Sequence, residues 1–221
     1  MQVHCHHEWD VSTARAREIQ ETLKSRICSS GEVSCVEYVA GIDVSINRFS
    51  KTGTAAVVVL KYPQMDIFEV KTFRGQIGFP YVPGLLTFRE APLVLNACRQ
   101  LTVTPDLVLV DGQGYAHPRR IGLASHLGLC LELPVVGCAK SRLIGEYEEP
   151  GENAGCTSVL KDKDEVIGEV VRTKDNVKPL FISVGHKISL VAAVRWTLAC
   201  CRGYRLPEPT RLAHQAAGGH L

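Results

Sequence analysis

The sequence lacks the features that would assign it to a membrane, secreted or strongly basic class of protein. No apolar run approaches the ~18 residues of a membrane-spanning helix, and residues 1–8 have no apolar signal core, so we expect a cytoplasmic protein without membrane contact. The nine cysteines include no C-x-x-C pair, which fits a reducing compartment better than a disulfide framework. The net charge of +2 is too small to indicate a nucleic-acid binder by bulk electrostatics, so any basic footprint must be local.

The chain does have enough apolar material for one substantial core. Its 221 residues, of which 45% are hydrophobic, fit a single domain over residues 1–221 and contain no internal repeat or low-complexity segment. We expect residues 1–9 and 218–221 to be flexible, because order is lost first at chain ends.

Apolar periodicity and turn residues predict a mixed sheet. The first three strands have short links, which makes them antiparallel neighbours. The later alternation of helices with strands, through a mixed pattern that ends near Val171, implies parallel pairing. The predicted strands are 36–44, 54–60, 67–73, 107–110, 135–138 and 180–184, and the predicted helices are 13–27, 85–101 with Pro92 inside, 119–129, 190–201 and 208–217.

Two of the predicted strands deliver a carboxylate at their end. The run Val39 to Ile42 leads into Asp43, and the run Leu107 to Val110 leads into Asp111. An ionised Asp beside a buried strand is costly unless a partner or a cation offsets its charge. Asp oxygens favour a hard ion such as Mg²⁺, which binds protein carboxylates together with substrate phosphates. The alternative is that each Asp only caps a strand end or a turn.

The predicted layout and five local strings indicate a family. Three antiparallel strands with an acid on the first, then a helix and a strand ending in an acid, form the layout of ribonuclease H-like nucleases. The strings resemble endonuclease V, a nuclease family that acts at inosine-type bases, over about residues 10–218. This resemblance implies an α/β fold of the ribonuclease H-like type, with a central mixed β-sheet flanked by helices. The strings are FPYVPGLLTFRE (79–90), DGQGYAHPRR (111–120), IGLASHLG (121–128), GCAKSRLIG (137–145) and RLAHQAAG (211–218).

The resemblance implies catalytic roles for three acids. The family holds Mg²⁺, with Mn²⁺ as a substitute, by carboxylates at the positions of Asp43 and Asp111. Its third acid lies where Glu90 stands in the FRE string, so Glu90 is also expected to serve the metal. Leu86 and Val94, one helical turn to either side of Glu90, offer no cation, which argues against an ordinary surface ion pair.

Two basic side chains complete the implied catalytic set. His214 in RLAHQAAG is a candidate metal ligand or proton-transfer group, although a lone His in a C-terminal helix is more often a surface or packing residue. Lys140 in GCAK is a candidate to hold a phosphate as a point charge. The alternative is that Lys140 only extends its amine from an apolar strand into water.

The resemblance also implies a substrate side of the site. Tyr81 lies on a loop stiffened by prolines, and the family uses the tyrosine of this string as a wedge that fills the gap left by an extruded base. The alternative is a core-packing tyrosine. Glycines let the backbone approach a base edge, and the resemblance places Gly84, Gly112 and Gly122 around an inosine pocket. The alternative is that these glycines only serve turns and helix starts. The expected substrate-binding residues are Tyr81, Pro83, Gly84, Leu86, Gly112, His117, Gly122, Arg119 and Arg120.

Other basic residues are weaker candidates. Six arginines are candidate contacts to the nucleic-acid backbone, although each alone is more often a solvated charge. The histidines of the N-terminus lie outside the matching strings, and we expect only adventitious metal binding there. The family usually has a small apolar residue where Cys138 stands, and a buried Cys behaves as a small hydrophobe, so we expect this departure to matter little. The arginines are Arg119, Arg120, Arg142, Arg202, Arg205 and Arg211, and the N-terminal group is His4, His6 and His7 with Cys5.

The residues and the resemblance together predict a monomeric, Mg²⁺-dependent endonuclease. It would recognise deoxyinosine or inosine, cut the second phosphodiester bond on the 3′ side to leave 3′-hydroxyl and 5′-phosphate ends, and serve DNA repair, because the strings look closer to the bacterial form. The alternatives are an inosine-specific endoribonuclease, since no motif ranks DNA against RNA, and a non-catalytic inosine binder, for which a lost acid would be expected. Actin-like ATPases and sugar kinases share the strand that ends in Asp, but their two large domains need a longer chain.

Overall fold

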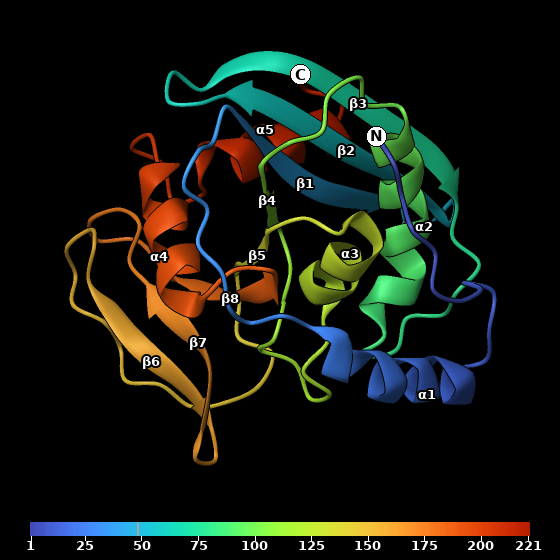
Figure 1. Cartoon of the computed structure of the whole chain (residues 1–221), viewed down its shortest axis with the longest axis horizontal. Helices are drawn as coiled ribbons and strands as arrows, with labels where there is room; N and C mark the ends of the chain where they lie inside the picture. The colour runs from blue at the N-terminus through green and yellow to red at the C-terminus, as the bar shows by residue number, and fades with distance from the viewer. Residues whose placement is uncertain (48) are drawn as a thin grey trace.

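Eight strands form the frame on which the rest of the chain is built. The computed structural model describes residues 1–47 and 49–221. The strands hydrogen-bond as one sheet in the order β3-β2-β1-β4-β5-β8-β7-β6 (Figure 1). They are β1 (Tyr38–Asn47), β2 (Thr52–Lys61), β3 (Asp66–Gln76), β4 (Leu107–Val110), β5 (Val135–Ala139), β6 (Thr157–Asp162), β7 (Glu165–Val171) and β8 (Leu180–His186).

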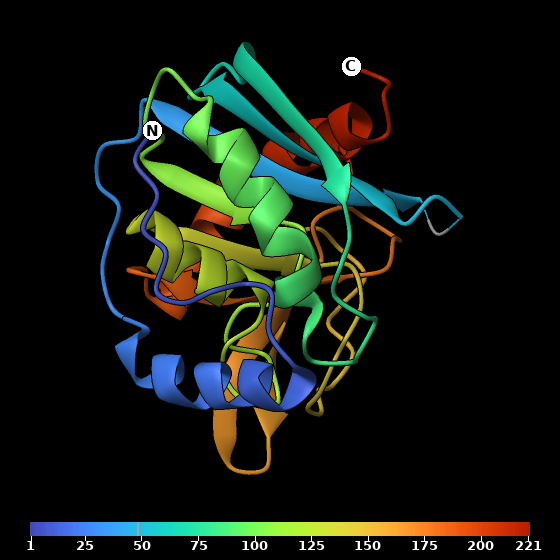
Figure 2. The same cartoon turned by 90° about the vertical axis from the view of Figure 1, so that its right-hand side faces the viewer.

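The central strands are apolar on both faces because helices cover both faces. On β4, Leu107 and Leu109 join one buried cluster with α4 and α5, whereas Val108 and Val110 join another with α2 and α3. A third cluster packs α1 beside the start of α2 and α3, and α1 lies along the lower edge of the molecule in two perpendicular views (Figures 1 and 2). The helices are α1 (Thr13–Leu23), α2 (Leu86–Arg99), α3 (Leu123–Leu131), α4 (Leu190–Ala199) and α5 (Glu208–Ala217).

The predicted α/β fold with a mixed sheet, antiparallel strands first and parallel strands next, is confirmed. β1, β2 and β3 pair antiparallel, and β1, β4 and β5 pair parallel. The later strands differ from the expected continuation, because β8 runs antiparallel to β5 and the β6–β7 hairpin pairs antiparallel with β8. The hairpin projects from the body (Figures 1 and 2) and occupies part of the stretch before Val171 to which the sequence assigned only a mixed pattern.

The predicted helices are present; α5 matches the predicted range 208–217, and the ends of the other four differ by a few residues. The first helix stops at Leu23 and continues only as a 3₁₀ turn over Lys24–Arg26. α2 retains Pro92 inside. The helix expected from residue 119 begins only at Leu123, because Arg120 takes a positive φ of 57° and Gly122 is the N-cap. Arg119 and Arg120 therefore lie in a loop.

The N-terminal segment, for which flexibility is predicted, contacts the body of the protein in the structure. The amino group of Met1 donates to the Leu101 carbonyl at 2.8 Å, and the His4 amide donates to the Cys130 carbonyl at 2.7 Å. His7 Nε2 lies 2.7 Å from Nε2 of the buried His126. These contacts run along the same side of the sheet as α3.

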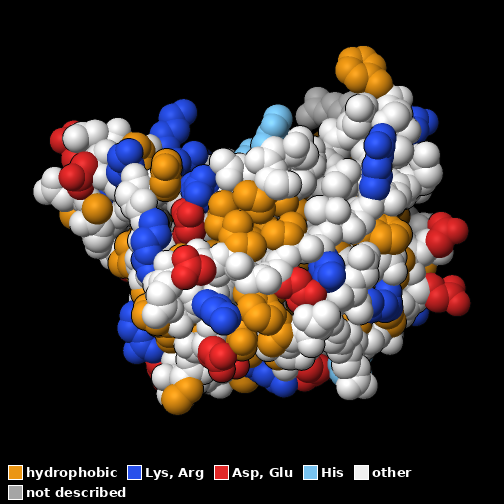
Figure 3. All heavy atoms as spheres, turned by 90° about the horizontal axis from the view of Figure 1, so that it is seen from above, with side chains coloured by type: hydrophobic (Ala, Val, Ile, Leu, Met, Phe, Trp, Pro, Cys, Tyr) orange, Lys and Arg blue, Asp and Glu red, His pale blue; other side chains and the backbone are white. Residues whose placement is uncertain are grey.

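The surface agrees with the near-neutral composition. Lys, Arg, Asp and Glu side chains alternate with hydrophobic patches over the face in Figure 3, and no single charge dominates it. All nine cysteines are free. Among the described residues, no helix has the length and apolarity that crossing a membrane requires.

Gly41 controls how closely α5 packs on the sheet. A Cβ built at Gly41 would lie 1.9 Å from the carbonyl oxygen of Pro209 in the first turn of α5. Only a residue without a side chain allows this approach. Gly41 on β1 therefore fixes the position of the helix that carries His214.

We expect Gly41→Ala to lower the free energy of unfolding by at least about 1–3 kcal/mol, because the new methyl group must push α5 off β1. Gly78→Ala is the matched control, since a Cβ there meets no atom of the described residues within 4 Å, and its effect should stay within about 0.5 kcal/mol. Urea unfolding of the three proteins measures both values. Equal stability of Gly41→Ala and the wild type would show that α5 is not held by this contact.

Candidate active site

The register of two parallel strands places Asp43 beside Asp111. Ile42 of β1 is paired with Val110 of β4, and the Asp111 amide donates to the Ile42 carbonyl at 2.9 Å. Each Asp is the next residue along, so both carboxylates leave the same edge of the sheet. Both side chains are only 11% exposed. The strand-end pattern of the sequence thus brings two acids together in space.

His214 joins these acids from α5. Its Nδ1 lies 2.6 Å from Oδ2 of Asp43, and its side chain is 60% exposed on the outer side of the pair. One ligand atom from each of Asp43, Asp111 and His214 lies within 4.8 Å of the others. The structure therefore groups three residues that could hold a metal ion, and the ring of His214 does not pack in the core.

Lys140 reaches the same group from the end of β5. β5 is the parallel neighbour of β4, with Gly137 opposite Val110, and Lys140 follows its last residue. The Lys140 ammonium forms an ion pair with Asp111 Oδ2. Burial raises the pKa of Asp111, the charge of Asp43 raises it further, and Lys140 opposes both. Lys140 thus points into the acidic group instead of into open water.

Glu90 lies close enough to sense these charges but is not one of the three grouped residues. It is buried in α2, with 7% of its surface exposed. Burial, with the charge of Asp43 as the second cause, raises the pKa of Glu90 to about 8. Glu90 is therefore a buried acid and not an exposed acid on the surface of α2.

The donor set fits a hard divalent cation. Carboxylate oxygens are the preferred ligands of such ions, and a neutral imidazole nitrogen can complete the set. The Asp43 charge raises the pKa of both Asp111 and Glu90, and a cation between these acids would offset that repulsion. The geometry supports a metal ion here without fixing its identity.

A cavity of about 400 Å³ adjoins the acids. It brings together the residues expected on the substrate side, except Arg119 and Arg120, and it includes Asp111 and Lys140 from the catalytic set. Tyr81 stands at its edge with 72% of its surface exposed, so it is not a core-packing tyrosine. The expected substrate residues that line the cavity are Tyr81, Pro83, Gly84, Leu86, Gly112, His117 and Gly122.

The Gly84 carbonyl anchors the loop that carries Tyr81 and lines the cavity. The Gly84 oxygen accepts from His117 Nε2 at 3.0 Å, from Arg119 Nη2 at 2.8 Å and from Gln20 Nε2 at 3.1 Å. The Arg119 amide donates to His117 Nδ1 at 3.2 Å, which leaves the ring proton on Nε2. Burial and the neighbouring Arg119 lower the pKa of His117 to about 4. The neutral ring therefore acts as a fixed donor to the loop.

The structure places most of the candidate arginines in internal contacts. Arg119 Nε donates to Gln20 Oε1 at 2.6 Å, and Arg120 forms ion pairs with Asp162 and Glu165 near the turn of the β6–β7 hairpin. Only Arg142 lines the 400 Å³ cavity. The remaining arginines bond to nearby groups: Arg202 to the Pro63 carbonyl, Arg205 to the Lys140 and Pro179 carbonyls, and Arg211 to Glu208.

Sequence patterns did not identify three residues of this region. Gln20 reaches Gly84 from α1, more than sixty positions away, and no local signal marks a helical Gln for such a role. Gln113 lines the cavity and donates to the Ser141 carbonyl at 2.8 Å. Arg89 lies with its guanidinium carbon 5.7 Å from the centre of the Tyr81 ring. The DGQG and FRE strings contain Gln113 and Arg89 and could have drawn attention to both.

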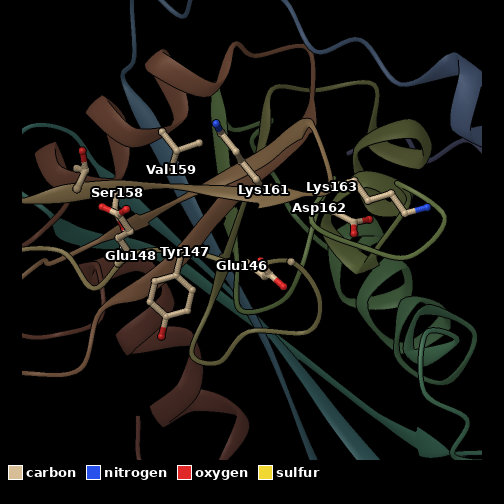
Figure 4. Close-up of a pocket in the computed structure, with 10 residues that line it drawn as sticks. Glu146, Tyr147, Glu148, Ser158, Val159, Lys161, Asp162 and Lys163 are labelled. Carbon is tan, nitrogen blue, oxygen red and sulfur yellow. The ribbon is translucent and has the colours of Figure 1, made fainter.

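A cavity larger than the one beside Asp111 lies elsewhere. It measures about 830 Å³ and runs between β6 and the preceding segment, with Glu146, Tyr147 and Glu148 along one side (Figure 4). It contains none of the predicted site residues. Lys161 and Lys163 point in different directions in Figure 4 and do not converge on a common point. This cavity is therefore not the candidate active site.

Comparisons with known proteins agree with the geometry. A family model described as Endonuclease V matches residues 21–215. Endonuclease V of Dehalococcoides mccartyi strain BAV1 is 53% identical over 211 residues, which cover 96% of this chain and 95% of that protein. The crystal structure of endonuclease V from Streptomyces avermitilis superposes with a TM-score of 0.91 at 39% identity and covers 99% of this chain and 97% of its own.

A second solved structure contains nucleic acid. Ciona intestinalis endonuclease V, in complex with a 24mer DNA containing an inosine followed by a ribo-adenosine, has a TM-score of 0.80 at 29% identity, with 93% of this chain and 96% of that chain covered. The family model spans most of the sequence, and the Dehalococcoides relative is more than half identical over nearly its whole length. The chain therefore belongs to the endonuclease V family.

Proposed function

We propose that this protein is a divalent-metal-dependent endonuclease that recognises deoxyinosine or inosine in nucleic acid. The observation that carries the proposal is the position of the Asp43, Asp111 and His214 group next to a cavity lined by glycines. The acidic group can bind a cation at the phosphate that is cut, and the glycine backbone of the cavity can contact the edge of a base. The Ciona relative bound to inosine-containing DNA supports the choice of substrate.

Mg²⁺ is the proposed ion, with Mn²⁺ as a substitute, and Asp43, Asp111 and Glu90 are the proposed acids that serve it. When bound, the cation would polarise the scissile phosphate and stabilise the leaving oxygen. Lys140 would hold a phosphate oxygen, because its ammonium already lies at the edge of the acidic group. His214 would orient or deprotonate the attacking water, since its exposed ring is held by Asp43.

The substrate side would separate recognition from chemistry. Tyr81 would enter the stack in place of the extruded base, because its ring is exposed on a loop held at Gly84. Gly84, Gly112 and Gly122 would surround the base in the cavity. Arg119 would hold the loop by its hydrogen bond to the Gly84 carbonyl, and Arg120 would hold the β6–β7 hairpin by its ion pair with Glu165. Neither is therefore proposed as a direct phosphate contact.

The proposed cut is at the second phosphodiester bond on the 3′ side of the lesion, with 3′-hydroxyl and 5′-phosphate products. The proposed role is repair of deaminated adenine in DNA by a cytoplasmic monomer, where the nine free cysteines stay reduced. Inosine-containing RNA is the alternative substrate. A non-catalytic binder is the less favoured reading of the site, because Asp43, Asp111 and Glu90 are all present.

The function can be tested with matched DNA and RNA strands that carry inosine or adenosine at one position. We expect cleavage of an inosine strand in Mg²⁺, no cleavage in chelator, and a single cut mapped to the second bond on the 3′ side. The adenosine strands control for general nuclease activity. Binding of inosine strands without a cut in either Mg²⁺ or Mn²⁺ would favour the non-catalytic binder.

Asp43→Asn and Asp111→Asn should each lower the cleavage rate at least about 100-fold, because the amide cannot hold a cation that stabilises the transition state by several kcal/mol. Affinity for the inosine strand in chelator should stay within a fewfold of wild type. Asp66→Asn, at an exposed end of β3, is the control and should cleave normally. Wild-type turnover by either site variant would remove that residue from the metal group.

His117 should make stability depend on pH in a defined direction. Its folded pKa of about 4 lies below the unfolded value of 6.5, so its contribution is complete above pH 6.5 and is lost as pH falls toward 4. The free energy of unfolding should therefore fall by roughly 2–3 kcal/mol more in the wild type than in His117→Gln between pH 7 and pH 4. The other buried histidines are common to both proteins and cancel. Parallel curves would show that His117 is not held neutral.

A further inference from the structure

A second cavity lies on the other side of Tyr81. It measures about 650 Å³ and is bounded by the turn between β1 and β2 and by the segment that follows β3. Tyr81 lines this cavity as well as the 400 Å³ cavity beside Asp111. The exposed ring of one residue thus stands between two hollows, and the proposed function uses only one of them.

The chemistry of this second cavity fits a nucleotide. Its walls include the apolar side chains of Ile46, Ile77 and the buried Phe79. Lys51 and Arg89 are the charged residues among its described lining, and both are positive. An apolar wall accepts a base face, and two cations without a facing acid accept a phosphate.

Arg89 has a free hydrogen-bond donor at this place. Its Nε is buried and has no partner among the described residues, and its guanidinium lies over the Tyr81 ring at 5.7 Å. Lys51 lines the same cavity, and its backbone carbonyl accepts from the Ile77 amide at 2.9 Å. Both cations therefore belong to the wall of this cavity, Arg89 beside the Tyr81 ring and Lys51 just before β2.

Phe49 presents an exposed aromatic ring just before β2. Its side chain is fully exposed, although it lies between two residues that line the cavity, Asn47 and Lys51. The Oδ1 atom of Asn47 accepts from the amides of Phe49 at 3.0 Å and of Ser50 at 3.1 Å. An exposed phenyl ring is a surface on which a base can stack.

We propose that this cavity is a second nucleotide subsite. An unpaired nucleotide of the nucleic acid that carries the extruded base would stack on Phe49 and the apolar wall, with its phosphate between Lys51 and Arg89. Tyr81 would then separate this nucleotide from the extruded base. The subsite rests on the proposed function for its substrate class. The nucleotide can come from the same strand or from the strand opposite, and both sources have the same chemistry.

The test compares affinity for inosine and adenosine strands, each single-stranded and in duplex, in chelator so that no strand is cut. Phe49→Ala should weaken binding at least about fivefold for both bases, because stacking on an aromatic ring is tolerant of sequence. Phe49→Trp should restore the affinity, and its added fluorescence should fall when the strand binds. Val191→Ala, which removes another exposed apolar side chain on α4, is the matched control and should bind normally.

Lys51→Gln tests the phosphate part of the subsite. It should reduce the slope of log affinity against log salt by about 0.7 for a single strand, the value for one lost phosphate contact. Lys163→Gln is its control, because Lys163 also has a positive φ, 59°, but lies at the β6–β7 turn, and it should leave the slope unchanged.

The outcomes separate the two sources and the two hypotheses. A loss with single strands assigns the nucleotide to the strand that carries the inosine, and a loss only in duplex assigns it to the opposite strand. Phe49→Ala binding within twofold of wild type in both forms would overturn the subsite. A wild-type protein that binds inosine and adenosine strands equally would overturn the proposed base recognition instead, while the effect of Phe49→Ala on both strands would still report on the subsite.

Discussion

The site depends on the cost of placing carboxylates side by side in a poorly hydrated place. The parallel register of β1 and β4 places Asp43 next to Asp111, and the sheet buries most of both side chains. The structure offsets part of this cost with Lys140 and His214, and part remains as the raised pKa of Asp111 and Glu90. Buried carboxylates that repel one another favour a bound cation, and the surrounding fold holds these carboxylates in position.

The parts of the site that the sequence predicted are those with local signals. An apolar run that ends in Asp marks a strand end, and two parallel neighbours bring such ends to one edge, so Asp43 and Asp111 could be paired before any coordinates were known. The mixed sheet and the helices follow from periodicity in the same way. Glu90, Lys140 and His214 required the family strings, because a single acid, lysine or histidine carries no positional information of its own.

The parts that the sequence did not predict depend on distant contacts. Arg120 pairs with Asp162 and Glu165, which are 42 and 45 positions away, and Arg119 bonds Gln20 at a separation of 99. Such partners leave no trace in local periodicity, so both arginines resembled free phosphate contacts. The antiparallel direction of β8 was missed for a related reason: an apolar run looks the same in either direction, and the direction is seen only in the pairing of β8 with β5 and β7.

The order in which the site residues occur along the chain has a consequence for synthesis. β1 supplies Asp43 early, whereas α5, which lies against β1 and supplies His214, is the last helix. The loop that this contact closes spans 171 positions, so the site is complete only when nearly every other element is already in place. A nascent or partly unfolded chain would therefore carry the acids without the finished constellation. The contact between His214 and Asp43 is in this way tied to the completed fold.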